Sequence, residues 1–161
     1  VVRTRPDGAF APKDRWAMDW YYPVLAGLVA GDTALRHLAD GRRPFTMDGL
    51  GVRCVSDRPW VTTAETCECA MAYLAAADRA SAVDLYTWAQ AMRVEEGRYL
   101  TGVVHPSGVA FPDRERTTYS AAAVILAADA LSEASPAAGL FTHRTGLPEI
   151  IETEAPVRDL D

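Results

Sequence analysis

The sequence has few of the residues that build disulfide frameworks or metal sites. Cysteine and histidine each occur only three times in 161 residues. The odd cysteine count without paired spacing argues against disulfides and favours a reducing, cytoplasmic compartment. Cys67 and Cys69 would point to different faces of a helix, so we interpret them as small buried residues. The three histidines show no ligand spacing with Cys54 or Asp57, so we expect no metal.

Basic clusters and long apolar runs are also missing. The formal net charge is -6 and the isoelectric point is about 5.0. The arginines are scattered, with Arg42 and Arg43 as the only adjacent pair. Such a chain is a poor match for a nucleic-acid backbone, which requires clustered basic residues. No stretch reaches the roughly 18 apolar residues of a membrane span.

The composition is 49% hydrophobic and 24% charged, which is typical of one folded domain. Residues 1–13 contain proline and glycine and are interpreted as a linker or arm, and residues 136–161 as an irregular tail. The folded part is expected over 14–135. Because the chain begins with Val1 rather than Met, we interpret it as a piece of a longer protein.

Periodicity within 14–135 predicts mainly helices. The expected helices span 14–30 (with a kink or break at Pro23), 33–40 (ending at Gly41), 62–77, 80–94 and 116–131. Residues 44–61 are expected to form a long connection. Residues 99–111 predict a small β-hairpin.

Two of these helices start in a similar way, which suggests an internal repeat. Thr62-Thr63 and Thr117-Thr118 each open an alanine-rich segment, and an Asp-Arg pair precedes each one and also begins at Asp14. The unit of roughly 45–55 residues fits helix-pair repeats. We therefore predict an all-α fold, a partial α/α toroid of about three helical hairpins with the small β-hairpin inserted. The alternative is an irregular helical bundle with coincidental threonine pairs.

Two families resemble these segments. The last helix, 115–131, is similar to the final inner helix of six-hairpin glycosidases, and 57–65 resembles an earlier inner helix. The whole of 14–135 resembles, more closely, an actinobacterial group described as prenyltransferase-like or cyclase-like. Its shared segments are 18–23, 51–60 and 121–131. Because a complete toroid has six hairpins, the resemblance implies a C-terminal half, completed by a missing N-terminal half or by a homodimer partner.

The chain departs from true terpenoid enzymes. The Asp-rich repeats of terpene cyclases and the zinc ligands of protein prenyltransferases are absent, so no cofactor is expected. Clustered carboxylates that could hold Mg²⁺ and a diphosphate are also missing.

Three acidic residues are the candidate catalytic groups. Asp19 lies among aromatic residues, where desolvation raises a carboxyl pKa and suits a general acid. Glu65 begins the helix at 62 and also completes a capping box with Thr62, which would explain it structurally. Glu68 lies one turn further on the same face and is ranked below Glu65. Glu115 precedes the last helix, in the position from which the resemblance implies a general base, although the charged run 113–116 could simply be solvated.

Seven further residues are expected to bind the substrate. Aromatic rings could stack on sugar faces, and an Arg-Asp pair could shape the long connection, although each of these residues could instead serve packing. The set is Trp16, Trp20, Tyr21, Arg53, Asp57, Trp60 and Tyr119.

Three functions remain open. The first is hydrolysis or binding of a glycoside, the second is binding of an isoprenoid, and the third is a non-catalytic scaffold. Tryptophan, tyrosine and paired acids around the cavity would favour sugar, whereas phenylalanine and aliphatic walls would favour an isoprenoid. The residues expected at the mouth favour sugar.

Overall fold

A computed structural model describes residues 14–143, and residues 1–13 and 144–161 lie outside the described part. The arm expected over 1–13 and most of the expected tail therefore cannot be compared with it. The described helices are α1 (Ala17–Leu25), α2 (Gly31–Phe45), α3 (Thr63–Ala75), α4 (Arg79–Ala89) and α5 (Thr118–Ser132), with short 3-10 turns η1 (Gln90–Met92) and η2 (Glu95–Gly97). None of them is long and apolar enough to cross a membrane.

A five-stranded sheet makes the fold mixed α/β, so the predicted all-α toroid segment is wrong. The strands are β1 (Thr46–Met47), β2 (Gly51–Arg53), β3 (Trp60–Thr62), β4 (Gly102–Val104) and β5 (Val109–Phe111). They pair antiparallel in sequence order. The expected hairpin over 99–111 supplies β4 and β5, but the expected connection over 44–61 contains three more strands. Strands of two or three residues are too short for an alternating pattern to reveal.

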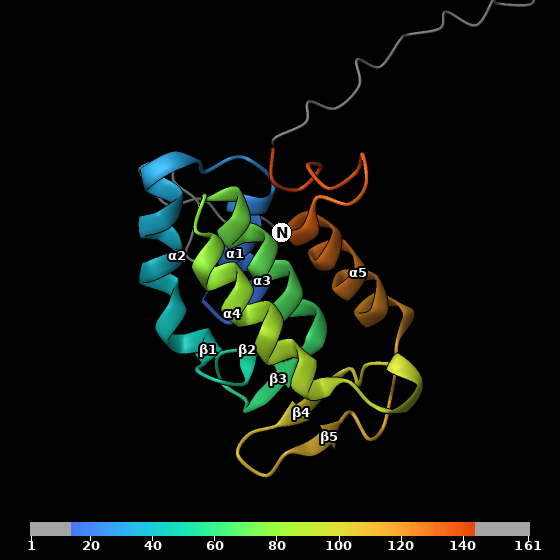
Figure 1. Cartoon of the computed structure of the whole chain (residues 1–161). Helices are drawn as coiled ribbons and strands as arrows, with labels where there is room; N and C mark the ends of the chain where they lie inside the picture. Colours follow the sequence, from blue (N-terminus) through green and yellow to red (C-terminus); the bar gives the residue numbers. More distant parts are fainter. Residues whose placement is uncertain (1–13, 144–161) are drawn as a thin grey trace, which may run out of the picture.

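Helix α3 lies at the centre of the molecule. Figure 1 shows it between α4 and α5, with α1 behind it and the sheet at the lower end of the helices. Every residue of α3 from Thr63 to Leu74 except Glu65 is buried. Its alanines and cysteines are small enough to let three helices approach closely, and Cys67 and Cys69 are fully buried as predicted.

The first turn of α3 is joined to the sheet by threonine hydroxyls. Thr63 Oγ1 donates to the carbonyl of Leu100 at 2.7 Å, and Thr66 Oγ1 accepts from Val52 N at 2.9 Å. The predicted capping box does not form, because the Thr62 side chain makes no capping bond. In α5, by contrast, Thr117 accepts from Ser120 N and caps the helix.

Helix α2 continues through the glycine that was expected to end it. A Cβ placed on Gly41 would lie 2.1 Å from Cδ1 of Trp20. The indole of Trp20 is stacked on Phe45 at 5.6 Å between ring centroids, and its Nε1 donates to the His37 carbonyl at 3.3 Å. Gly41 is therefore required by close packing inside the helix rather than by a helix end.

We expect Gly41→Ala to destabilise the protein. Helix propensity alone predicts a gain of up to about 1 kcal/mol. The clash with a ring that cannot shift should reverse this sign and cost about 1–3 kcal/mol in the free energy of unfolding. Urea denaturation would measure it. Repeating the substitution in a Trp20→Leu background is the control: if the penalty persists there, the ring is not its cause.

Candidate functional site

The main candidate site is centred on Glu68, in the middle of α3. The residue is only 9% exposed. The Tyr21 hydroxyl of α1 donates to its Oε2 at 2.5 Å, and the Tyr119 hydroxyl of α5 donates to its Oε1 at 2.5 Å. A buried carboxyl group is tolerated only when its oxygens have partners, and here each oxygen has one. Glu68 thus links three helices.

The two phenols remain protonated donors. Burial raises the pKa of Tyr21 well above its usual value, and the nearby Glu68 carboxylate raises it further. Burial also raises the pKa of Tyr119, with the hydrogen bond to Glu68 as the next cause. Ionisation of either phenol would remove a donor and place a second negative charge beside Glu68. The two neutral phenols therefore hold the Glu68 carboxylate in one orientation by hydrogen bonds and add no charge beside it.

Glu68 borders a cavity of about 380 Å³ between α1, α3 and α5. The polar end of this cavity is formed by Glu68 with Tyr22 and Tyr119, and the rest of its wall is almost entirely apolar. The lining residues are Tyr22, Leu25, Ala26, Glu68, Met71, Tyr119, Ala122, Ala123, Leu126 and Phe141. A cavity with apolar walls and a few convergent polar groups is the usual form of a small-molecule site.

Glu65 lies one turn before Glu68 on the same helix. Burial raises the pKa of Glu65, the neighbouring Thr62 hydroxyl opposes part of this rise, and the charge of Glu68 adds to it. A carboxyl group with a raised pKa holds its proton closer to neutral pH, as a general acid must. Glu65 is not among the residues that line the cavity, so its influence on a ligand would pass through Glu68.

The other two predicted catalytic acids lie elsewhere. Asp19 is partly buried in α1 but does not line the cavity. Glu115 is exposed on the loop before α5, where its Oε2 accepts from Thr101 Oγ1 at 3.0 Å. The structure therefore brings Tyr21, Tyr119 and the Glu65–Glu68 pair together, but not Asp19 or Glu115.

The predicted tryptophans are spread over the molecule. Trp16 is 47% exposed with the Arg15 guanidinium over its ring at 4.8 Å. Trp20 is in the core beside α2, as described above. Trp60 stacks on Phe111 at 4.4 Å between centroids and so joins β3 to β5 across β4. None of these rings lines the cavity beside Glu68.

Arg53 and Asp57 do not form the expected pair. Arg53 donates to the Pro44 carbonyl, and Asp57 pairs with Arg15 at 3.2 Å on the surface. Both contacts hold the segment between α2 and α3 against its neighbours. Within residues 14–143 no group of three or more His, Cys, Asp or Glu residues could hold a metal ion.

From the sequence, Glu65 ranks above Glu68 as a candidate catalytic residue. Of the two, it is Glu68 that lines the cavity. One signal could have found it: a glutamate in the middle of an alanine- and cysteine-rich buried helix requires partners on neighbouring helices. The Tyr22 side chain, which also borders the cavity, was likewise not singled out.

A comparison with known proteins gives one informative match. The chain is 47% identical over 146 residues to a protein of Mycolicibacterium hassiacum named MMP endo-(1,4)-3-O-methyl-alpha-D-mannosidase. The alignment covers 91% of this chain and 40% of that protein. The chain thus spans less than half the length of the curated relative. No family model matches the chain.

Replacing the two phenols should separate their structural roles. Tyr21→Phe removes the donor to Oε2 of Glu68, a residue that is only 9% exposed, and should cost about 1–3 kcal/mol in the free energy of unfolding. Tyr119 is half exposed, so water can replace its hydroxyl and Tyr119→Phe should cost less than about 1 kcal/mol. Chemical denaturation of both variants tests this. Equal losses in the two variants would contradict the view that the Tyr21 hydrogen bond is buried whereas the Tyr119 hydrogen bond is open to water.

Glu65→Gln should change how stability depends on pH. The pKa of Glu65 is raised above its usual value of 4.5 in the folded state. Between pH 4.5 and this folded-state pKa, the folded state therefore binds more protons than the unfolded state. The free energy of unfolding of the wild type therefore falls as pH rises through that window. The variant lacks this loss, so its stability relative to wild type should be higher at pH 7 than at pH 4. Denaturation at both values measures it, with the exposed Asp84→Asn as control; a flat difference would rule the effect out.

Proposed function

We propose that this chain forms part of a carbohydrate-active protein that acts on α-mannosides bearing methyl ethers, with Glu68 as the carboxylate that faces the glycoside. One observation carries the proposal: a buried carboxylate, held by two phenols, closes the polar end of an apolar cavity. The similarity to a protein named as a mannosidase supports a glycoside-hydrolase-like role in general terms.

The chemistry calls for more than one carboxyl group. Glycoside hydrolysis passes through a positively charged, oxocarbenium-like transition state, and two carboxyl groups usually flank the bond that breaks. Glu65 and Glu68 lie on one helical face, with Cβ atoms about 5–6 Å apart, so both stand on the same side of a bound sugar. Among the described residues that line the cavity, Glu68 is the only acid. We propose that Glu68 supplies one member of the pair.

Glu65 would act as a positioning residue. Its raised pKa lowers the fraction of Glu65 that is ionised beside Glu68 at a given pH, which weakens the repulsion between the two groups. Tyr21 and Tyr119 would keep the Glu68 carboxylate in one orientation while the substrate binds. Such preorganisation is a large part of what an enzyme contributes to the rate.

The apolar wall fits a methylated sugar. A methyl ether replaces a hydroxyl donor with an apolar group, and it loses less on burial against Leu25, Met71, Leu126 and Phe141 than a free hydroxyl would. The rings of Tyr22 and Tyr119 present apolar faces to a sugar while their hydroxyls stay near Glu68. The name of the Mycolicibacterium hassiacum relative also refers to a 3-O-methyl sugar.

Isoprenoid binding is the second candidate, because the same wall is largely aliphatic. Its diphosphate would have to lie either beside Glu68, which would repel it, or outside the cavity. The polar end thus favours a neutral glycoside over a diphosphate.

Glu68→Gln should reduce the release of reducing ends from α-(1→4)-linked 3-O-methylmannose oligosaccharides by roughly 10²–10⁴-fold, the usual contribution of one acid–base group. Glu65→Gln should cause a smaller loss together with a shifted pH–rate profile. Asp84→Asn, on the exposed face of α4, is the control and should retain activity. Circular dichroism and melting temperature verify that each variant is folded.

The outcomes are distinct. Full activity of a folded Glu68→Gln variant would exclude the assigned role. A larger rise in melting temperature with methylated than with unmethylated mannose oligosaccharides would support the apolar wall as the site for methyl ethers. A rise with isoprenoid diphosphates alone would favour the second candidate.

A further inference from the structure

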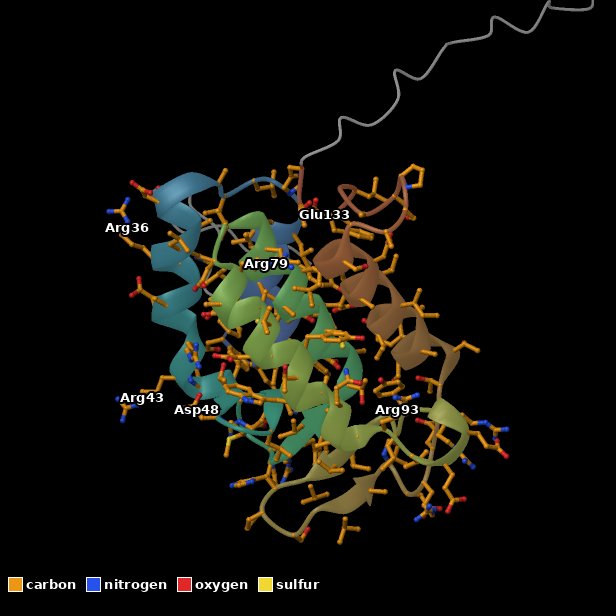
Figure 2. The ribbon with its side chains drawn as sticks, viewed as in Figure 1. Arg36, Arg43, Asp48, Arg79, Arg93 and Glu133 are labelled. Carbon is orange, nitrogen blue, oxygen red and sulfur yellow. The ribbon has the colours of Figure 1, made fainter. Side chains whose placement is uncertain are left out.

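A second cavity lies near the far end of α4, where this helix meets the sheet. Its volume is also about 380 Å³, and it is lined by Arg93, Val94, Glu95, Arg114 and Arg116. In Figure 2, Arg93 lies at the lower right beside the loop after α4, whereas Arg36 and Arg43 are on α2 at the opposite side. The lining is rich in charge, unlike that of the apolar cavity beside Glu68.

Two loops are held side by side to form this cavity. Thr101 N donates to the Glu115 carbonyl at 2.9 Å, and Thr101 Oγ1 donates to Glu115 Oε2 at 3.0 Å. Glu115 thus turns toward Thr101, while its neighbours Arg114 and Arg116 both line the cavity. Glu115 N also donates to the Pro112 carbonyl at 3.2 Å, so a turn precedes Glu115 and places Arg114 and Arg116 on either side of it.

The third arginine is positioned by a tight turn. Val94 N donates to the Arg98 carbonyl at 2.7 Å, and Gly97 has a φ of 77° that closes this turn. The Arg93 guanidinium folds back over Gly97, with Nη2 only 3.2 Å from where a Cβ of that residue would stand. The missing side chain of Gly97 therefore leaves room for the guanidinium.

The cavity has more positive than negative charge. Three arginines line it together with one acidic residue, Glu95. Over residues 14–143, no ion pair engages Arg93, Arg114 or Arg116, although Arg98 of the same turn pairs with Glu96 at 2.6 Å. These three arginines lie together although the chain as a whole has a net charge of -6. A guanidinium group can donate two parallel hydrogen bonds to two oxygens of one carboxylate or phosphate. None of these three arginines makes such a bond to a carboxylate within residues 14–143.

We propose that this cavity binds an oxyanion group, a phosphate or a carboxylate, on a small organic ligand. The volume exceeds that of a lone phosphate ion, so it admits a carrier of about the size of one sugar ring. The site would be separate from the glycoside site beside Glu68 and does not depend on the function proposed for that site.

The test is an NMR titration of the chain at low ionic strength with glucose 6-phosphate, glucuronate and glucose. We expect saturable shifts of the Arg93, Arg114 and Arg116 side-chain resonances with one or both anions and none with glucose. The double variant Arg114→Gln and Arg116→Gln should weaken the affinity by at least about tenfold, since it removes two groups that form charge-assisted hydrogen bonds to an oxyanion. Arg43→Gln, an exposed arginine on α2, is the matched control and should bind as the wild type does.

Binding of glucose 6-phosphate alone identifies the group as phosphate, binding of glucuronate alone identifies it as carboxylate, and binding of both supports the shared chemistry. Three results would overturn the proposal. These are the absence of saturable shifts with either anion, an equal loss of affinity in Arg43→Gln, and equal shifts with sodium chloride at matched ionic strength. Unchanged melting temperatures in the variants would exclude unfolding as the cause of a lost signal.

Discussion

A buried carboxylate in the middle of a buried helix is the constraint on which the rest of this structure depends. Glu68 lies in α3 among small residues that have almost no exposed surface. A carboxylate in such a place is costly unless both of its oxygens find donors. The donors are phenols from α1 and α5, so the same two bonds that satisfy Glu68 also set the distance of these helices from α3. The apolar cavity is the space that this spacing leaves.

The distance of Glu68 from the sheet is fixed by the first turn of α3. The Thr63 hydroxyl bonds to Leu100, two residues before β4, and the Thr66 hydroxyl bonds to Val52 in β2. These bonds fix the position of α3 along its axis relative to the sheet. A shift of α3 by one turn would break them and would move Glu68 away from Tyr21 and Tyr119.

Much of the helical structure can be predicted from the sequence, because alanine-rich and amphipathic patterns extend over ten or more residues. Contacts between residues that are distant in the sequence could not be predicted in this way. Gly41 has the local signature of a helix end, and only the nearby Trp20 ring explains why the helix continues. The strands β1, β2 and β3 are two or three residues long and exist through pairing with distant residues, for which no local pattern gives a sign.

For the same reason, the sequence singles out only some of the residues that the structure brings together around Glu68. Tyr21, Tyr119 and the α3 acids were singled out by residue type, and they do lie together. The choice between Glu65 and Glu68 depended on which side of α3 faces α5, a tertiary fact. From the sequence, Trp20 and Trp60 are candidates for stacking on a ligand. In the structure, the Trp20 ring stacks on Phe45 and the Trp60 ring stacks on Phe111. An aromatic ring has the same local signature in both settings.

The short strands at the two ends of the sheet have a consequence for association. β1 has two residues and follows Pro44, while β5 has three residues and lies between Pro106 and Pro112. Proline offers no backbone N–H, and so short an edge presents few groups on which another strand could pair. Extension of the sheet by a neighbouring molecule is therefore disfavoured at both edges.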